Sequence, residues 1–144
     1  MQSKSLDRSD DGAGVGENGR FLRNVLKANA IFSTVSGLMF ILFASSLASL
    51  FGSTTNPMIF VGLGLVILPF AIYVYKISTM EALNTRLVWV IIGLDTFWVV
   101  ASAVLLLTNI VPLTTMGKWM IGFSAEIVAV FAILEFAGLR KLRR

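Results

Sequence analysis

Apolar residues run along this chain in blocks that are too long for the strands and amphipathic helices of a soluble domain. No charged residue lies between Lys27 and Lys76, and this stretch exceeds the roughly 20 residues that one membrane-spanning helix needs. The turn formers at 52–57 (Gly-Ser-Thr-Thr-Asn-Pro) divide it. The pattern therefore predicts one helix over about 28–51 and a second over about 58–75.

The second half of the chain shows the same arrangement. A polar link at 76–86 precedes a third apolar run, at about 87–107, and an uncharged turn at 108–115 separates it from a fourth, at about 119–139. Pro69 lies inside the second run, where a membrane helix tolerates a kink. We predict an all-α fold, a bundle of four transmembrane helices that forms one domain over 21–144 with the lipid bilayer around it.

The first 20 residues differ from the rest in being polar and rich in glycine, serine and aspartate. Such a segment buries too little apolar surface to offset the entropy of ordering, so the sequence predicts a disordered arm at 1–20. A cleaved secretory signal is the alternative. The arm is long and acidic for a signal peptide and the apolar run continues past about 20 residues, which favours a retained first helix.

Basic residues give the predicted orientation. An excess of lysine and arginine marks the cytoplasmic side of membrane proteins, and here only Lys118 falls on the side of the two short turns. We therefore expect both termini to be cytoplasmic. The residues on the other side are Lys4, Arg8, Arg20, Arg23, Lys27, Lys76, Arg86, Arg140, Lys141, Arg143 and Arg144.

Composition narrows the possible functions. Hydrophobic residues make up 56% of the chain and charged residues 14%, against about 45–50% and about 25% in soluble domains. The chain has no cysteine and no histidine, which excludes disulfides, thiol nucleophiles and imidazole ligands for haem or zinc. We expect no metal, no cofactor and no enzymatic activity. We attribute the net charge of +4 to the basic residues at the helix ends, which set the orientation in the membrane. We therefore expect no nucleic-acid partner.

Acidic residues inside the predicted spans are the strongest candidates for function, because a charge at the bilayer centre costs about 2.5–3.5 kcal/mol on insertion scales. Asp95 lies about 12 Å and Glu126 about 20 Å from the inner ends of their helices, at 1.5 Å per residue. Neither has a basic residue at its depth. Glu135 is only about one turn from the inner end, so we expect it to reach the interface and meet Arg140 or Lys141.

Small and polar residues on the same helix faces suggest partners for these carboxyl groups. We predict that Asp95 and Glu126 face the bundle interior, toward a stripe of small and polar residues in the first helix. The structural alternative is hydrogen bonding between helices, and the functional one is a proton- or ligand-binding site. The predicted polar site comprises Asp95, Glu126, Trp98, Ser102, Asn29 and Ser33, with Gly37 and Gly122 as helix-packing positions.

The segment 93–102 (Gly-Leu-Asp-Thr-Phe-Trp-Val-Val-Ala-Ser) resembles a group of small four-helix bacterial membrane proteins of uncharacterised function. The stretches 21–37 and 136–140 are similar to that group too, so the resemblance covers about 21–142. It implies the bacterial inner membrane and no specific activity. Small multidrug transporters carry their essential glutamate in the first helix, which is uncharged here, and four-helix thiol oxidoreductases need cysteines.

Two classes of function follow from the sequence. The first is a non-enzymatic accessory or scaffold protein that packs against another membrane protein through faces of small residues. The second is a small oligomeric transporter or proton-linked permease that uses Asp95 and Glu126. The second class requires self-association, because four short helices rarely enclose a pathway.

Overall fold

A computed structural model describes the backbone of residues 3–143 and the side chains of 16–142. Within those residues every element of regular secondary structure is a helix, and four stretches are long and apolar enough to cross a membrane: 16–42, 58–78, 85–108 and 115–142. These findings confirm the predicted all-α class and the four spans. The helices are α1 (Ser3–Leu42), α2 (Ala44–Phe51), α3 (Met58–Ser78), α4 (Thr85–Thr108) and α5 (Thr115–Arg143).

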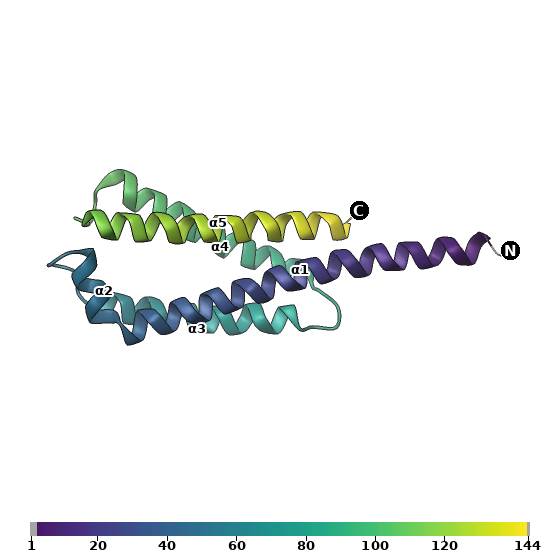
Figure 1. Ribbon diagram of the computed structural model, residues 1–144, viewed down its shortest axis with the longest axis horizontal. Coiled ribbons are helices and arrows are strands. Elements are labelled where there is room, and N and C mark those ends of the chain that lie inside the picture. Colours follow the sequence, from purple (N-terminus) through teal and green to yellow (C-terminus); the bar gives the residue numbers. More distant parts are fainter. Residues whose placement is uncertain (1–2, 144) are drawn as a thin grey trace.

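The helices form two antiparallel hairpins that lie side by side (Figure 1). The first hairpin consists of α1 and α2 with α3, and the second of α4 with α5. Both chain termini and the 79–84 connection lie at one end of the bundle, here called the terminal end. The connections at 52–57 and 109–114 lie at the opposite end, the loop end.

The start of α1 differs from the prediction. The helical backbone begins at Ser3, inside the segment predicted to be disordered, and side chains before residue 16 lie outside the described part. A helix nucleated in an apolar span is extended at its end at little cost. Contacts with α5 also hold its first described turns: Leu22 is buried, and Asn18 Nδ2 donates to the Lys141 carbonyl at 3.5 Å.

The predicted first helix is divided at Phe43, between α1 and α2, although Phe43 N still donates to Met39 O at 2.9 Å. The α4 and α5 helices begin earlier than the apolar pattern indicated, because polar side chains accept from their first amides. Asn84 Oδ1 accepts from the N–H of Arg86 at 3.0 Å, and Thr114 Oγ1 accepts from the N–H of Gly117 at 3.0 Å.

The α1–α3 contact is closest where two glycines meet. A Cβ placed on Gly64 would lie 2.7 Å from the Gly37 carbonyl oxygen and 2.6 Å from Ile41 Cγ1. A Cβ on Gly37 would lie 2.9 Å from Leu68 Cδ2. Gly37 is therefore a packing position as predicted, but it serves the contact between α1 and α3 of this chain and is not open to another protein.

The buried apolar residues form two separate clusters. The larger, at the terminal end, joins all four long helices and includes Leu26, Val74, Val88 and Leu139. The smaller, at the loop end, packs α2 against Phe60 of α3. Between the clusters, in the middle of the bundle, the packing is incomplete.

The outer surface of the bundle is apolar. Leu42, Leu107 and Trp119 are 73%, 82% and 73% exposed, and exposed large hydrophobic side chains occur on every helix. A soluble monomer rarely exposes so much contiguous apolar surface. Together with the four spans, this surface is that of a multi-pass membrane protein whose helices face lipid.

Candidate functional site

A cluster of three polar side chains is buried between the two hairpins. The Asn29 amide nitrogen of α1 donates to Asp95 Oδ2 of α4 at 2.7 Å and to Glu135 Oε1 of α5 at 2.7 Å. The exposed fractions of Asn29, Asp95 and Glu135 are 1%, 4% and 0%. One amide group therefore ties the first hairpin to two carboxyl groups of the second.

Helical periodicity explains why these side chains meet. Residues three, four and seven apart share a helix face. Asp95 follows Val88, Ile91 and Ile92 on the buried face of α4, and Asn29 lies on the buried face of α1 with Leu22 and Leu26. At about 1.5 Å per residue, Asn29 lies about 9 Å from Arg23 at the terminal end.

Ser33 completes the cluster on α1. Its hydroxyl donates to Asn29 Oδ1 at 3.2 Å, one turn away, which fixes the amide with its nitrogen toward the carboxyl groups. Of the predicted site residues, the structure therefore brings Asn29 together with Asp95 directly and Ser33 through Asn29.

The two carboxyl groups are close together and incompletely satisfied. Both accepting oxygens lie 2.7 Å from the same nitrogen, so they are less than twice that distance apart. Glu135 Oε2 is buried and has no hydrogen-bond partner. Two ionised carboxylates so close in an apolar interior repel strongly, and a proton held by one of them relieves that repulsion.

No cation neutralises the pair among residues 16–142. Lys27 is exposed, and Arg23 is engaged elsewhere, because its guanidinium donates to the carbonyl oxygens of Ser78, Met80 and Glu81 at and just after the end of α3. Within the same residues no group of three acidic side chains could hold a metal ion.

The partners predicted for Asp95 on α4, Trp98 and Ser102, do not form hydrogen bonds with it. Trp98 Nε1 is buried without a hydrogen-bond partner, so the indole does not donate to Asp95. Ser102 is buried but makes no hydrogen bond to Asp95 either, because it lies two turns further along the helix. Asn29 from the other hairpin occupies the position that these residues were expected to fill.

A cavity of about 320 Å³ adjoins the cluster in the middle of the bundle. Asp95, Ser33 and Trp98 line it, so the polar cluster forms part of its wall. Its other walls are mostly apolar and aromatic and come from all four long helices: Phe32, Ser36, Phe40, Leu63, Val66, Ile67, Phe70, Leu94, Phe97, Ser124 and Val128.

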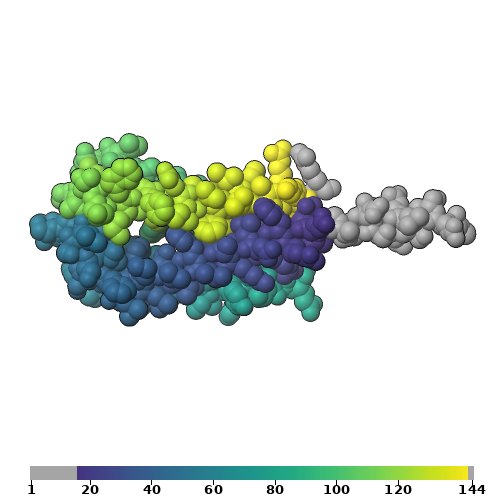
Figure 2. All heavy atoms as spheres, viewed as in Figure 1, coloured from purple at the N-terminus to yellow at the C-terminus, as the bar shows by residue number. Residues whose placement is uncertain are grey.

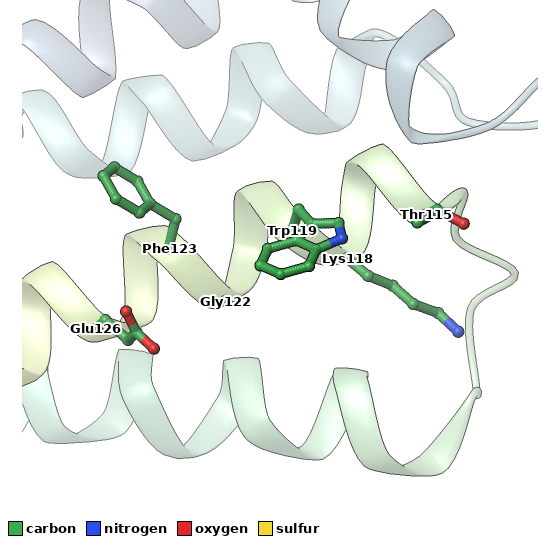
Figure 3. A pocket seen from close by; sticks show the side chains of 6 residues that line it. All are labelled: Thr115, Lys118, Trp119, Gly122, Phe123 and Glu126. Carbon is green, nitrogen blue, oxygen red and sulfur yellow. The ribbon is translucent and has the colours of Figure 1, made fainter.

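The prediction that Glu126 faces the bundle interior is wrong. Glu126 is exposed and borders a shallow groove on the outer side of α5 (Figure 3). In this view Glu126 lies at one end and the Lys118 side chain extends toward the other, with Trp119 between them and Phe123 pointing away from Glu126. Gly122 lines the same groove and has open space beside it, since an added Cβ would meet only Leu106 Cδ1 at 3.9 Å.

The expectation for Glu135 is also wrong, because Glu135 is buried beside Asn29 and does not reach the interface. Glu126 and Glu135 are nine residues apart, which is two and a half turns of a helix with 3.6 residues per turn. Only one of them can face the interior. The burial of Val128 and Leu139, seven residues before and four after Glu135, marks the buried face. Periodicity could have identified Glu135, whereas depth along the helix favoured Glu126.

Comparison of the chain with protein-family models, with curated proteins and with solved structures gives no match.

Proposed function

We propose that this chain is a small proton-linked transporter of the bacterial inner membrane, with both termini cytoplasmic. One observation carries the proposal: Asn29 bridges the carboxyl pair Asp95 and Glu135, which has no cation beside it among residues 16–142, and Asp95 lines a cavity in the middle of the bundle. Buried ionisable groups in membrane helices typically mark proton and substrate pathways.

The position of Asn29 suggests how binding of a proton would be coupled to a movement of the two hairpins. Asn29 belongs to one hairpin and both carboxyl groups to the other, so the two hydrogen bonds join the hairpins. When the pair holds a proton, both carboxyl groups remain close to the amide. When the proton leaves, repulsion between the carboxylates weakens this contact. Loss and gain of one proton would thus loosen and restore the contact between hairpins.

The groups that face the pair are few. The α1 helix contributes Asn29 and Ser33, which do not titrate near neutral pH, and α3 contributes apolar residues to the adjoining cavity. The proton therefore belongs to Asp95 and Glu135 together. The prediction from the sequence differed, because it named Glu126, and not Glu135, as the second carboxyl group of a proton-linked permease.

The test is a proton-gradient measurement in inverted membrane vesicles. The vesicles are energised, the gradient is followed with a fluorescent amine, and amphiphilic cations, anions and neutral compounds are added in turn. We expect at least one class to collapse the gradient partly in vesicles with the wild-type protein. Asp95→Asn and Glu135→Gln should abolish the collapse, and the matched carboxyl-to-amide change Glu126→Gln should retain it. Absence of collapse with every class would refute the proposal.

Orientation can be tested separately, because the chain has no cysteine. Single cysteines at Thr54, in the loop-end connection, and at Ala82, in the terminal-end connection, are both at exposed positions. A thiol reagent that does not cross membranes should label Thr54→Cys in intact spheroplasts and Ala82→Cys only after permeabilisation. The opposite pattern would refute cytoplasmic termini.

A second candidate function, the accessory or scaffold protein, is favoured by the outer face of α5. An exposed carboxylate within a span is costly in lipid, and Gly122 leaves room there for a close helix. Native mass spectrometry of protein extracted in mild detergent distinguishes the two. A stoichiometric second protein that is released by Gly122→Leu supports the accessory role, and a homo-oligomer or monomer alone counts against it.

A further inference from the structure

The cavity in the middle of the bundle opens sideways, between α3 and α4. Val66 of α3 and Phe97 of α4 both line it, yet each is 70% exposed on the bundle surface. These two side chains therefore form a mouth on the side that faces lipid. On the opposite side the hairpins are joined by α1 and α5, whose rings Phe32 and Phe131 lie 5.7 Å apart.

The opposite face of the bundle, onto α1 and α5, is more closed toward the terminal end, where Leu22 packs against Gly138. Figure 2 shows the described part of α1 beside α5, with a small opening between them toward the loop end. The most exposed residues that line the cavity are Val66 and Phe97, which lie on α3 and α4. A molecule dissolved in the bilayer would reach the cavity there without crossing the polar connections at either end.

The lining combines aromatic rings with one acidic group. Five of its side chains are aromatic: Phe32, Phe40, Phe70, Phe97 and Trp98. Asp95 lies in the same wall, and among residues 16–142 no lysine or arginine lines the cavity. Aromatic faces attract organic cations, and a carboxylate in an apolar setting requires an opposite charge or a proton. An anionic ligand would meet repulsion from Asp95, and a purely apolar ligand would leave that group unpaired.

We propose that this cavity is a binding site for a small lipophilic organic cation, which enters from the bilayer between α3 and α4 and pairs with Asp95. The volume of about 320 Å³ is at the lower end of the about 300–1,000 Å³ typical of ligand pockets, so the ligand is a compact ring-bearing molecule. This inference rests in part on the proposed function, since it names the substrate class of that transporter.

The experiment compares two probes of the same shape that differ in charge. Benzyltrimethylammonium is a compact aromatic cation, and neopentylbenzene is its neutral isostere. Binding of each to the full chain in phosphatidylcholine nanodiscs is measured by tryptophan fluorescence and normalised to the amount that partitions into empty nanodiscs. We expect the cation to bind at least about tenfold more tightly, which corresponds to about 1.4 kcal/mol.

Three variants assign that preference to the cavity. Asp95→Asn should reduce the ratio of the two affinities to about one, and Val66→Trp, which fills the mouth, should weaken binding of both probes. Glu126→Gln is the matched control: it removes a carboxylate outside the cavity and should leave the ratio unchanged. Equal binding of the two probes to the wild type would overturn the proposal, as would loss of the preference in Glu126→Gln or unchanged binding in Val66→Trp.

Failure of this inference can be distinguished from failure of the proposed function. Binding of the cation through Asp95 with no collapse of the proton gradient by any compound would retain the site and refute transport. Collapse by anions or neutral compounds alone, with no preference for the cation in nanodiscs, would retain transport and refute this ligand class.

Discussion

Replacement of Asn29 by leucine tests the central contact between the two hairpins. The two side chains share the same branched shape and the same number of non-hydrogen atoms, so the change removes hydrogen bonding while keeping the shape of the side chain. Asn29→Leu loses the two bonds donated to Asp95 and Glu135 and the one accepted from Ser33. Among residues 16–142 Asn29 is the only nitrogen donor to either carboxyl group.

The expected cost follows from those three bonds. Side-chain hydrogen bonds between membrane helices contribute about 0.6 kcal/mol on average and about 1.7 kcal/mol at most. Three such bonds give a range of about 2 to about 5 kcal/mol. Because both remaining acceptors stay buried without a donor, their desolvation is uncompensated. We expect Asn29→Leu to lower the free energy of unfolding by about 3 kcal/mol.

The assay is reversible unfolding in mixed micelles of mild and denaturing detergent, followed by circular dichroism. Asn24→Leu is the matched control, because it makes the same change at an exposed position of α1 and should cost less than about 0.5 kcal/mol. A cost for Asn29→Leu equal to that of the control would refute the reasoning.

A triple variant separates loss of the bonds from exposure of the carboxyl groups. Asn29→Leu combined with Asp95→Leu and Glu135→Met removes the amide and both carboxyl groups at once and leaves only the Ser33 hydroxyl of the cluster. Replacing all partners of a buried polar network with apolar groups is often close to neutral. We therefore expect the triple variant to be more stable than Asn29→Leu alone. If it were less stable, the cost would lie in packing and not in unpaired carboxyl groups.

Two further predictions concern the contacts that hold α3 in place. Gly64→Ala should destabilise the protein by about 1–3 kcal/mol through overpacking, because its Cβ would press on Ile41. Gly62→Ala is the control and should leave the stability unchanged, because there is open space beside Gly62. Equal thermal unfolding temperatures for the two variants would contradict the close packing of Gly64 against α1. Arg23→Ala removes the donor to three carbonyls at and just after the end of α3 and should speed amide hydrogen exchange over 79–83, whereas Arg20→Ala, at an exposed position, should not. Unchanged exchange in Arg23→Ala would contradict the capping role.

The sequence by itself determined the class of fold and the number of spans. Long uncharged runs divided by turn formers admit few solutions in lipid, because every backbone polar group in the bilayer core must be satisfied within a helix. The faces of α1 and α4 were also evident, since Asn29 and Asp95 fall on stripes with the periodicity of a packed helix. These features are local along the chain, so one sequence suffices to find them.

Tertiary structure decided which residues share a site. Depth along the last helix favoured Glu126, but the rotation of α5 about its own axis places Glu135 inside and Glu126 outside. The hydrogen bonds from Asn29 to two carboxyl groups depend on how the hairpins are placed against each other, which helical periodicity alone does not fix. Likewise, Gly37 was visible as a small residue in the sequence, but its partner Gly64 follows only from the crossing of α1 and α3. Local patterns specify helices and faces, whereas the site arises from packing between segments that are far apart in the chain.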